Sequence, residues 1–280
     1  MQLRSRYLPP GWYPDSATAI QTEIEGFLQY INSFQFDSTV YRGGLVPHAG
    51  WYFSGRLAAL VFHACARNIK PDVVALFGGH LGSGAGIIYA DQAWDTPLGP
   101  VACDLDLAQP LAEELGLKPE GAQTNDNTVE IQIPLVKYFF PESRLVALRA
   151  PHTERALDLG LRLAQLANAQ GKTMVAIGST DLTHYGSNYG FIPRGSGPEA
   201  VRWVREINDK GFIDKCLDMD SHGLLKHAAE NNSACSAGGA AAAVSACRAM
   251  GAEQGRLLDY YTSYDIMPGQ SFVGYAGIVF

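Results

Sequence analysis

The chain has 280 residues, of which 47% are hydrophobic and 18% charged, and its formal net charge is −7. This length and composition predict a sizeable packed core, whereas the negative charge disfavours nucleic acid or an acidic membrane as partner, because both need a basic surface. No stretch approaches the roughly 20 apolar residues of a membrane span. Residues 1–7 lack a signal peptide's apolar core, and the five scattered cysteines show no disulfide spacing. We therefore expect a cytoplasmic protein.

Helical and strand-like segments alternate along the chain. A helix is expected at about 16–34 and another is expected to start near Ser54. Further helices are expected at about 105–115, 128–139, 154–169, 198–209, 219–229 and 237–246. Apolar strands are expected to end at Val46, Phe77, Leu148 and Gly178, with antiparallel additions at 86–102 and two closing strands at 257–264 and 272–280. This alternation without a linker predicts one α/β domain over residues 1–280, with a central, mostly parallel sheet between layers of helices.

Histidines follow three of these strands. His48 comes after Val46-Pro47, His80 after Gly78-Gly79, and His184 a few residues after the third strand. In open α/β sheets, ligands bind outside the carboxyl ends of the strands. The three histidines are therefore a candidate metal or catalytic cluster, although each could instead be an exposed turn residue. His152 follows another strand and is either a fourth member or a surface residue.

Cys235 directly precedes a helix rich in alanine and glycine, in the segment Ser233-Ala234-Cys235-Ser236. The amides at a helix N-terminus favour negative charge, which lowers a thiol's pKa and suits it to metal binding or redox chemistry. The alternative is a buried, inert cysteine, the usual fate of a free thiol.

Asp181 and His184 are three residues apart, so they share a face if they lie on a turn or on the first turn of a helix. A carboxylate beside an imidazole raises its basicity and fixes its orientation, as general acid–base catalysis requires. Asp181 could instead cap a helix. Glu130 is a candidate supporting group near the site.

Several blocks of the chain, in order, resemble the Memo family, also called AmmeMemoRadiSam system protein B. The blocks are Pro47-His48-Ala49-Gly50 with Ser54-Gly55, then Gly79-His80, and residues 129–134, 179–186, 261–265 and 273–276. The opening, from Arg6-Tyr7 to Tyr13-Pro14, is also similar. The resemblance covers nearly the whole chain.

This resemblance implies a fold like that of the class III extradiol dioxygenases, which hold non-haem Fe(II) with two histidines and a carboxylate. It implies that His48 and His80 are metal ligands and that Cys235 replaces the carboxylate. His184 then matches the acid–base residue, with Asp181 beside it.

Two positions depart from the family pattern and bear on substrate preference. The family usually reads Glu-His-Ser-Ile-Glu where this chain has residues 126–130, so a histidine is replaced by Asn127. Its cysteine is usually followed by glycine, and here by Ser236.

The leading hypothesis is a metal-dependent, dioxygenase-like oxidoreductase that binds Fe(II) or copper and acts on a small molecule. Two imidazoles and a thiolate also suit zinc, which would indicate a hydrolase. A non-catalytic adaptor for phosphopeptides or other ligands is a further alternative. The family name suggests a radical SAM protein and an AMMECR-type protein as partners. Five aromatic residues could line the pocket or belong to the core: Trp51, Tyr52, Trp94, Tyr185 and Tyr189.

Overall fold

The computed structural model describes residues 3–121, 124 and 126–280, and nine of the described strands form one sheet. Its centre is parallel, in the order β2 (Gly43–Val46), β9 (Met174–Ser179), β3 (Val73–Leu81) and β8 (Arg144–Pro151). In this register Val73 to Phe77 lie opposite Met174 to Gly178. The carboxyl ends of these strands therefore meet at one edge, as expected.

Antiparallel strands extend this parallel centre on both sides. Strand β12 (Phe272–Val279) pairs with β2 and carries β10 (His184–Tyr185) and β11 (Arg256–Thr262). On the other side, β4 (Ile87–Ile88) pairs with β8, and β7 (Lys118–Pro119) with β4. A separate small sheet contains β1 (Leu3–Arg4), β5 (Ala93–Trp94) and β6 (Val101–Ala102). The antiparallel additions were predicted, but the strand at Leu3 was not.

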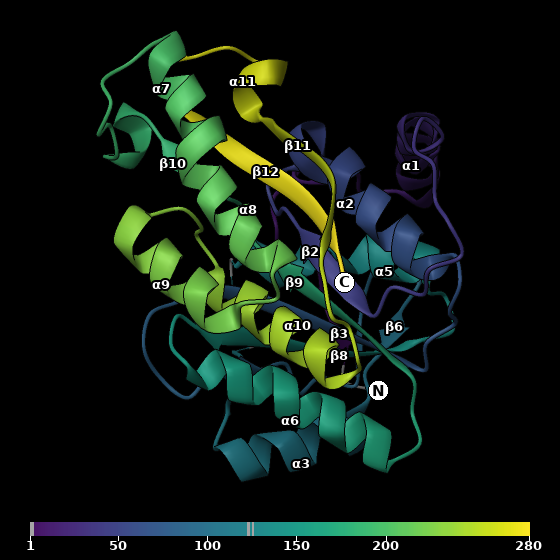
Figure 1. The fold of residues 1–280 in the computed structure, drawn as a ribbon. Coiled ribbons are helices and arrows are strands. Elements are labelled where there is room, and N and C mark those ends of the chain that lie inside the picture. The colour runs from purple at the N-terminus through teal and green to yellow at the C-terminus, as the bar shows by residue number, and fades with distance from the viewer. Residues whose placement is uncertain (1–2, 122–123, 125) are drawn as a thin grey trace.

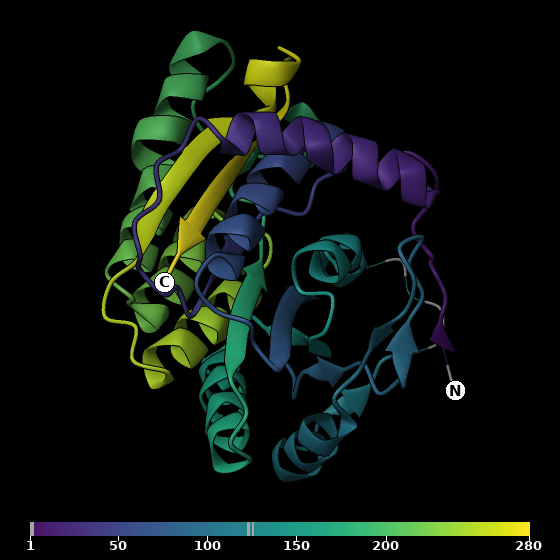
Figure 2. The same ribbon diagram turned by 90° about the vertical axis from the view of Figure 1, so that its right-hand side faces the viewer.

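Helices cover both faces of the large sheet (Figures 1 and 2). Successive strand residues alternate between two apolar cores: Ala75 and Phe77 face one, Val74 and Leu76 the other. The first core packs against α3 (Leu105–Leu115), α6 (Arg155–Ala169), α8 (Asp209–Leu217), α9 (Ser221–Asn231) and α10 (Ala237–Ala249). The second packs against α1 (Ala17–Ile31), α2 (Trp51–Ala66) and α5 (Ile133–Phe139). The predicted three-layer α/β fold is confirmed.

Four boundaries differ from the predictions for local reasons. Helix α2 begins at Trp51 rather than near Ser54, because Gly50 has extended backbone and occupies the N-cap. The helix expected at 128–139 is divided into α4 (Asn127–Glu130) and α5, where Pro134 occupies the first turn. The helix expected at 198–209 is α7 (Pro198–Trp203), followed by a π-helical turn, η2 (Val204–Asn208), and then by α8. Strand β3 continues beyond Phe77 to Leu81, so His80 lies within it.

Short elements complete the chain near the sheet edge: a 3₁₀ turn, η1 (Ser187–Tyr189), and α11 (Ser263–Ile266). Among the described residues, no helix is both long enough and apolar enough to cross a membrane.

Helices α6 and α10 approach each other closely at Gly160. A Cβ atom added to Gly160 would lie 1.9 Å from the carbonyl oxygen of Ala242, whereas a Cβ atom at Gly26, in helix α1, would meet nothing within 4 Å. We expect Gly160→Ala to lower the free energy of unfolding by about 1–3 kcal/mol through overpacking. The matched variant Gly26→Ala should raise it by about 0.5–1 kcal/mol. Urea denaturation of both variants measures the difference, and equal effects would contradict the close-packing argument.

Candidate metal centre

Three predicted ligands converge at the carboxyl edge of the parallel strands. One potential ligand atom from each of His48, His80 and Cys235 lies within 4.8 Å of the other two. The Sγ atom of Cys235 is 3.1 Å from Nε2 of His48, and the rings of His48 and His80 have centroids 5.0 Å apart. His48 follows β2, His80 lies near the end of β3, and Cys235 lies between α9 and α10. The geometry therefore brings together the residues that the sequence placed at separate element ends.

The His48 ring is buried, and a polar contact at its Nδ1 atom fixes its orientation. Its Nδ1 atom is 3.2 Å from Oγ of Ser179, at the end of the neighbouring strand β9. The amide of Gln132 donates to the carbonyl of Pro47 (2.7 Å) and to the same Ser179 hydroxyl (3.3 Å). With Nδ1 held in this way, Nε2 faces the Cys235 sulfur. Partners of this kind fix the tautomer of a ligating histidine.

The orientation of His80 depends on Asp126. Oδ2 of Asp126 lies 3.2 Å from Nδ1 of His80, which leaves Nε2 of that ring for a ligand. Arg149 holds the same carboxylate oxygen (Nε to Oδ2, 3.4 Å) and donates to the carbonyl of Gly79 (3.0 Å). The role of Asp126 was not predicted; the only signal in the sequence was its place in the family block that contains Asn127.

The backbone at His80 is left-handed, with φ of 58°. Such a conformation is costly for a residue other than glycine and persists only where its surroundings impose it. Those surroundings are tight, since a Cβ on Gly79 would come within 2.5 Å of the Ser236 side chain. Ser236, one of the two departures from the family pattern, therefore packs directly against the ligand-bearing strand.

The charges of the cluster support one another. Burial raises the pKa of Cys235, but the neighbouring imidazoles of His48, His184 and His80 outweigh it and bring that pKa well below its usual value. Burial lowers the pKa of His80, yet Asp126 and Cys235 raise it to about 10. These shifts favour the ionised thiol and the protonated form of His80, so a cation that binds there competes with protons.

Asp181 acts on two histidines without bonding to either ring. Its Oδ2 atom is 3.9 Å from Nε2 of His48 and 3.9 Å from Nε2 of His184, and its Oδ1 accepts the backbone N–H of His48 at 2.7 Å. No helix begins at this residue, so the helix-cap alternative is wrong. Within the described part of the chain, Nε2 of His184 has no hydrogen-bond partner. Burial lowers the pKa of His184, but Asp181 and Cys235 raise it to about 10.

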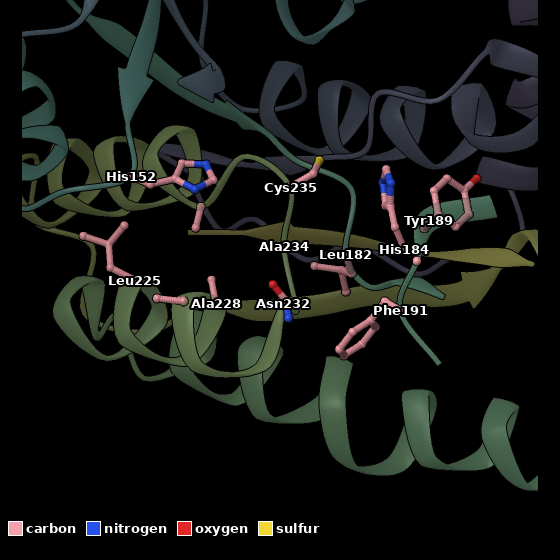
Figure 3. A pocket seen from close by; sticks show the side chains of 13 residues that line it. His152, Leu182, His184, Tyr189, Phe191, Leu225, Ala228, Asn232, Ala234 and Cys235 are labelled. Carbon is pink, nitrogen blue, oxygen red and sulfur yellow. The ribbon is translucent and has the colours of Figure 1, made fainter. Parts of the chain in front are cut away.

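Two pockets meet at this centre. The imidazole pocket, of about 470 Å³, is lined by residues that include His48, His80, Asp181 and Asn127. The thiol pocket, of about 530 Å³, is lined by Cys235 and by residues of the α9–α10 side (Figure 3). His184 and Tyr189 line both pockets and separate them, with ring centroids 4.9 Å apart. The centre is therefore approached from two sides.

The other sequence candidates have different positions. Asn127 lines the imidazole pocket and donates to the carbonyl of His48 (2.8 Å), and His152 lines the thiol pocket. Glu130 is not at the centre: its buried carboxylate accepts the backbone N–H groups of Tyr7 and Leu8. Of the five aromatic candidates, only Tyr189 lines either pocket beside the centre, whereas three are buried and Tyr52 is 69% exposed.

Asp209 is a buried carboxylate that the sequence did not single out. It accepts the backbone N–H of Thr183 (3.0 Å) and the hydroxyl of Tyr260 (2.7 Å), so it holds the loop that carries His184. Burial raises the pKa of Asp209 to about 6, although the hydrogen bonds from Thr183 and Tyr260 lower it. Compared with the unfolded chain, the folded state therefore favours the protonated form of the Asp209 carboxyl.

This raised pKa makes stability depend on pH. The contribution of Asp209 is fully present below about pH 4, the pKa of an unfolded aspartate, and is lost as the pH rises through 6. We expect Asp209→Asn, which stays neutral, to match the wild type near pH 4 and to exceed its free energy of unfolding at pH 7.5 by up to about 3 kcal/mol. Urea denaturation at both pH values measures this, and a parallel pH profile for the two proteins would contradict it.

Comparison with known proteins indicates the same family as the sequence blocks. A family model described as "Memo-like protein" matches residues 7–279. The chain is 32% identical to a "MEMO1 family protein" of Thermococcus onnurineus, over 96% of each chain, and 32% identical to one of Methanococcoides burtonii with the same coverage. An uncharacterized Escherichia coli protein of known structure aligns with a TM-score of 0.47 and 14% identity, over 78% of this chain and 91% of that one. The chain belongs to the Memo family.

Proposed function

We propose that the protein is a metal-dependent oxidoreductase of the dioxygenase-like type. In this proposal His48, His80 and Cys235 bind one metal ion, iron(II) in the first place or copper, and His184 transfers a proton. The observation that carries the proposal is the convergence of the three donor atoms within 4.8 Å.

The donor set fits a transition metal. His48 and His80 are each held at Nδ1, by Ser179 and Asp126 respectively, and this leaves the Nε2 atoms as donors beside a thiolate. Three protein ligands leave further coordination positions for small molecules. A redox-active ion bound there would supply one-electron chemistry with O₂. The thiolate is softer than a carboxylate, so copper is as compatible with this set as iron.

His184 is suited to hold and deliver a proton. Its pKa of about 10 keeps the imidazole protonated at neutral pH, and the Asp181 carboxylate balances that charge from 3.9 Å. Because its ring lies in the wall between the two pockets, it is adjacent to a molecule in either one. A group of this kind contributes about 10²–10⁴-fold to a proton-transfer step.

Zinc is the main alternative, because two imidazoles and a thiolate are also a known zinc-binding set. The test is elemental analysis of anaerobically purified protein, followed by O₂-uptake measurements on iron-loaded and zinc-loaded samples. We expect near-stoichiometric iron or copper in the wild type and its loss from the His48→Ala/Cys235→Ala double variant. Stoichiometric zinc with ester or amide hydrolysis would support a hydrolase, and no metal after reconstitution would leave a binding protein.

A further inference from the structure

Glu130 is a buried carboxylate outside the metal centre, and it belongs to a segment that contacts both ligating histidines. We call this segment, residues 126–132, the bracket. We propose that Glu130 is a positioning residue: by joining the bracket to residues 7–13, it fixes the separation of the His48 and His80 rings. The inference rests on the proposed metal centre, because its effect is measured at the metal, but it does not depend on which reaction the protein catalyses.

The bracket fixes the end of strand β3. Oδ2 of Asp126 lies 3.2 Å from Nδ1 of His80, and the hydroxyl of Thr128 accepts the backbone N–H of Gly79 at 3.0 Å. Asp126 and Thr128 are both buried. A Cβ atom added to Gly78 would lie 2.2 Å from the same hydroxyl, so the bracket packs closely against this strand. A shift of the bracket therefore shifts His80.

The bracket also fixes the turn that follows β2. The side-chain amide of Asn127 donates to the carbonyl of His48 at 2.8 Å, and that of Gln132 donates to the carbonyl of Pro47 at 2.7 Å. Strand β9 lies between β2 and β3 in the sheet, so these two strands do not hydrogen-bond to each other. The bracket is therefore a direct link between the chain segments that carry the two histidine ligands.

Glu130 joins the bracket to the N-terminal segment, residues 7–13. Its Oε1 atom accepts the backbone N–H of Leu8 at 2.9 Å and the hydroxyl of Tyr13 at 3.1 Å, and its Oε2 atom accepts the backbone N–H of Tyr7 at 3.0 Å. The carboxylate is 4% exposed. Hydrogen bonds to a charged group are stronger than those between neutral groups, and a buried donor left unpaired is costly. The N-terminal segment and the bracket therefore have one preferred relative position.

The N-terminal segment in turn contacts the residues that follow His48. The carbonyl of Trp12 accepts the backbone N–H of Trp51, at the start of α2, at 2.8 Å. The ring N–H of Trp51 donates to the carbonyl of Ile131, within the bracket, at 3.2 Å. The N-terminal segment, the start of α2 and the bracket thus form a closed ring of contacts beside His48. Because Glu130 accepts from three donors in this ring, its loss loosens the support of both histidines.

Cobalt(II) titration of the metal-free protein tests this role. Glu130→Gln keeps the size of the side chain but replaces one acceptor oxygen by a donor. We expect it to weaken cobalt binding about three- to tenfold, as for the loss of one hydrogen bond. The ligand-field bands, which report the geometry of the ligands around cobalt, should change. The sulfur-to-cobalt band from Cys235 should persist, because the carbonyl of Asp181 holds the backbone N–H of Cys235 at 3.2 Å.

Asp104→Asn is the matched control, because it removes another buried carboxylate that holds local structure. Asp104 caps α3 by accepting the backbone N–H of Leu107 at 3.1 Å, and it pairs with Lys172 at 2.7 Å. Its replacement should lower the free energy of unfolding in urea but leave the cobalt affinity and both kinds of band unchanged. A merely structural role for Glu130 would produce this same pattern.

Tyr13→Phe is a milder change at the same contact, since Glu130 keeps its two backbone donors and the ring stays in place. It should weaken cobalt binding about two- to threefold, and it carries the test if Glu130→Gln does not fold. The inference is overturned if the folded variants at Glu130 and Tyr13 bind cobalt like the wild type, or if Asp104→Asn changes the bands as they do. Failure of the wild type itself to bind cobalt would overturn the metal centre, and this inference with it, so the two failures are distinguishable.

Discussion

Replacing Cys235 by serine should abolish the sulfur-to-metal absorption band that cobalt(II) develops when a thiolate binds it, and should weaken metal binding by more than about 100-fold. A serine hydroxyl has nearly the same shape but stays protonated at neutral pH, so the centre loses its only anionic donor among the three ligands. The band reports sulfur ligation directly, and cobalt titration of the metal-free protein gives the affinity. This loss of metal affinity is larger than the roughly 10- to 100-fold loss expected when a residue that hydrogen-bonds to a ligand is replaced.

Two further variants calibrate this result. Cys65→Ser removes a buried thiol remote from the centre, and because that thiol faces the carbonyl of Gly43 at 3.4 Å, a hydroxyl is accommodated there. It should leave the band and the affinity unchanged. Asp126→Asn removes the charge beside Nδ1 of His80 and should weaken cobalt binding about 10- to 100-fold with the band retained. A persistent band in Cys235→Ser, or its loss in Cys65→Ser, would contradict the assignment of the ligands.

The second large effect concerns His184. We expect His184→Gln to slow substrate-dependent O₂ uptake about 10²–10⁴-fold, because glutamine fills similar space but cannot exchange a proton at neutral pH. The sulfur-to-cobalt absorption band should remain that of the wild type, since His184 is assigned to proton transfer and not to the metal. The rate is measured on iron-loaded protein with whichever small molecule supports O₂ uptake in a substrate screen.

The two readouts separate three roles for His184. A slow rate with an intact cobalt spectrum supports proton transfer. A lost spectrum would make His184 a fourth ligand, which its place in the wall of both pockets permits. An unchanged rate would remove the acid–base role and leave the ring as part of the partition with Tyr189.

The arrangement of the centre has a consequence for reactions with two reactants. The histidine ligands line one pocket and the cysteine ligand lines the other, with His184 and Tyr189 between them. Tyr189 belongs to a 3₁₀ turn that lies between two glycines with positive φ, Gly186 and Gly190. Because the ligands are divided between two pockets, two molecules can reach the same centre without competing for one cavity.

The sequence by itself was sufficient to predict the α/β fold and the positions of the candidate ligands. Buried parallel strands are continuous apolar runs, so the residues after Val46 and Phe77 were expected at one edge, although β3 in fact continues to Leu81. Cys235 was singled out by its place before a helix, and its role as a ligand was implied by the resemblance to the family. Each of these signals lies within a short segment of the chain, so it can be recognised without knowing the tertiary structure.

Only the tertiary structure decided which groups support and separate the ligands. Asp126 contacts His80 across the sheet edge, Glu130 binds the N-terminal segment instead of the centre, and Asp181 stands 3.9 Å from two rings rather than bonding to one. The division into two pockets likewise depends on the contact between His184 and Tyr189 of η1, which line both pockets. Such contacts join residues far apart along the chain, and no periodicity or spacing encodes them, because they arise from how whole layers pack.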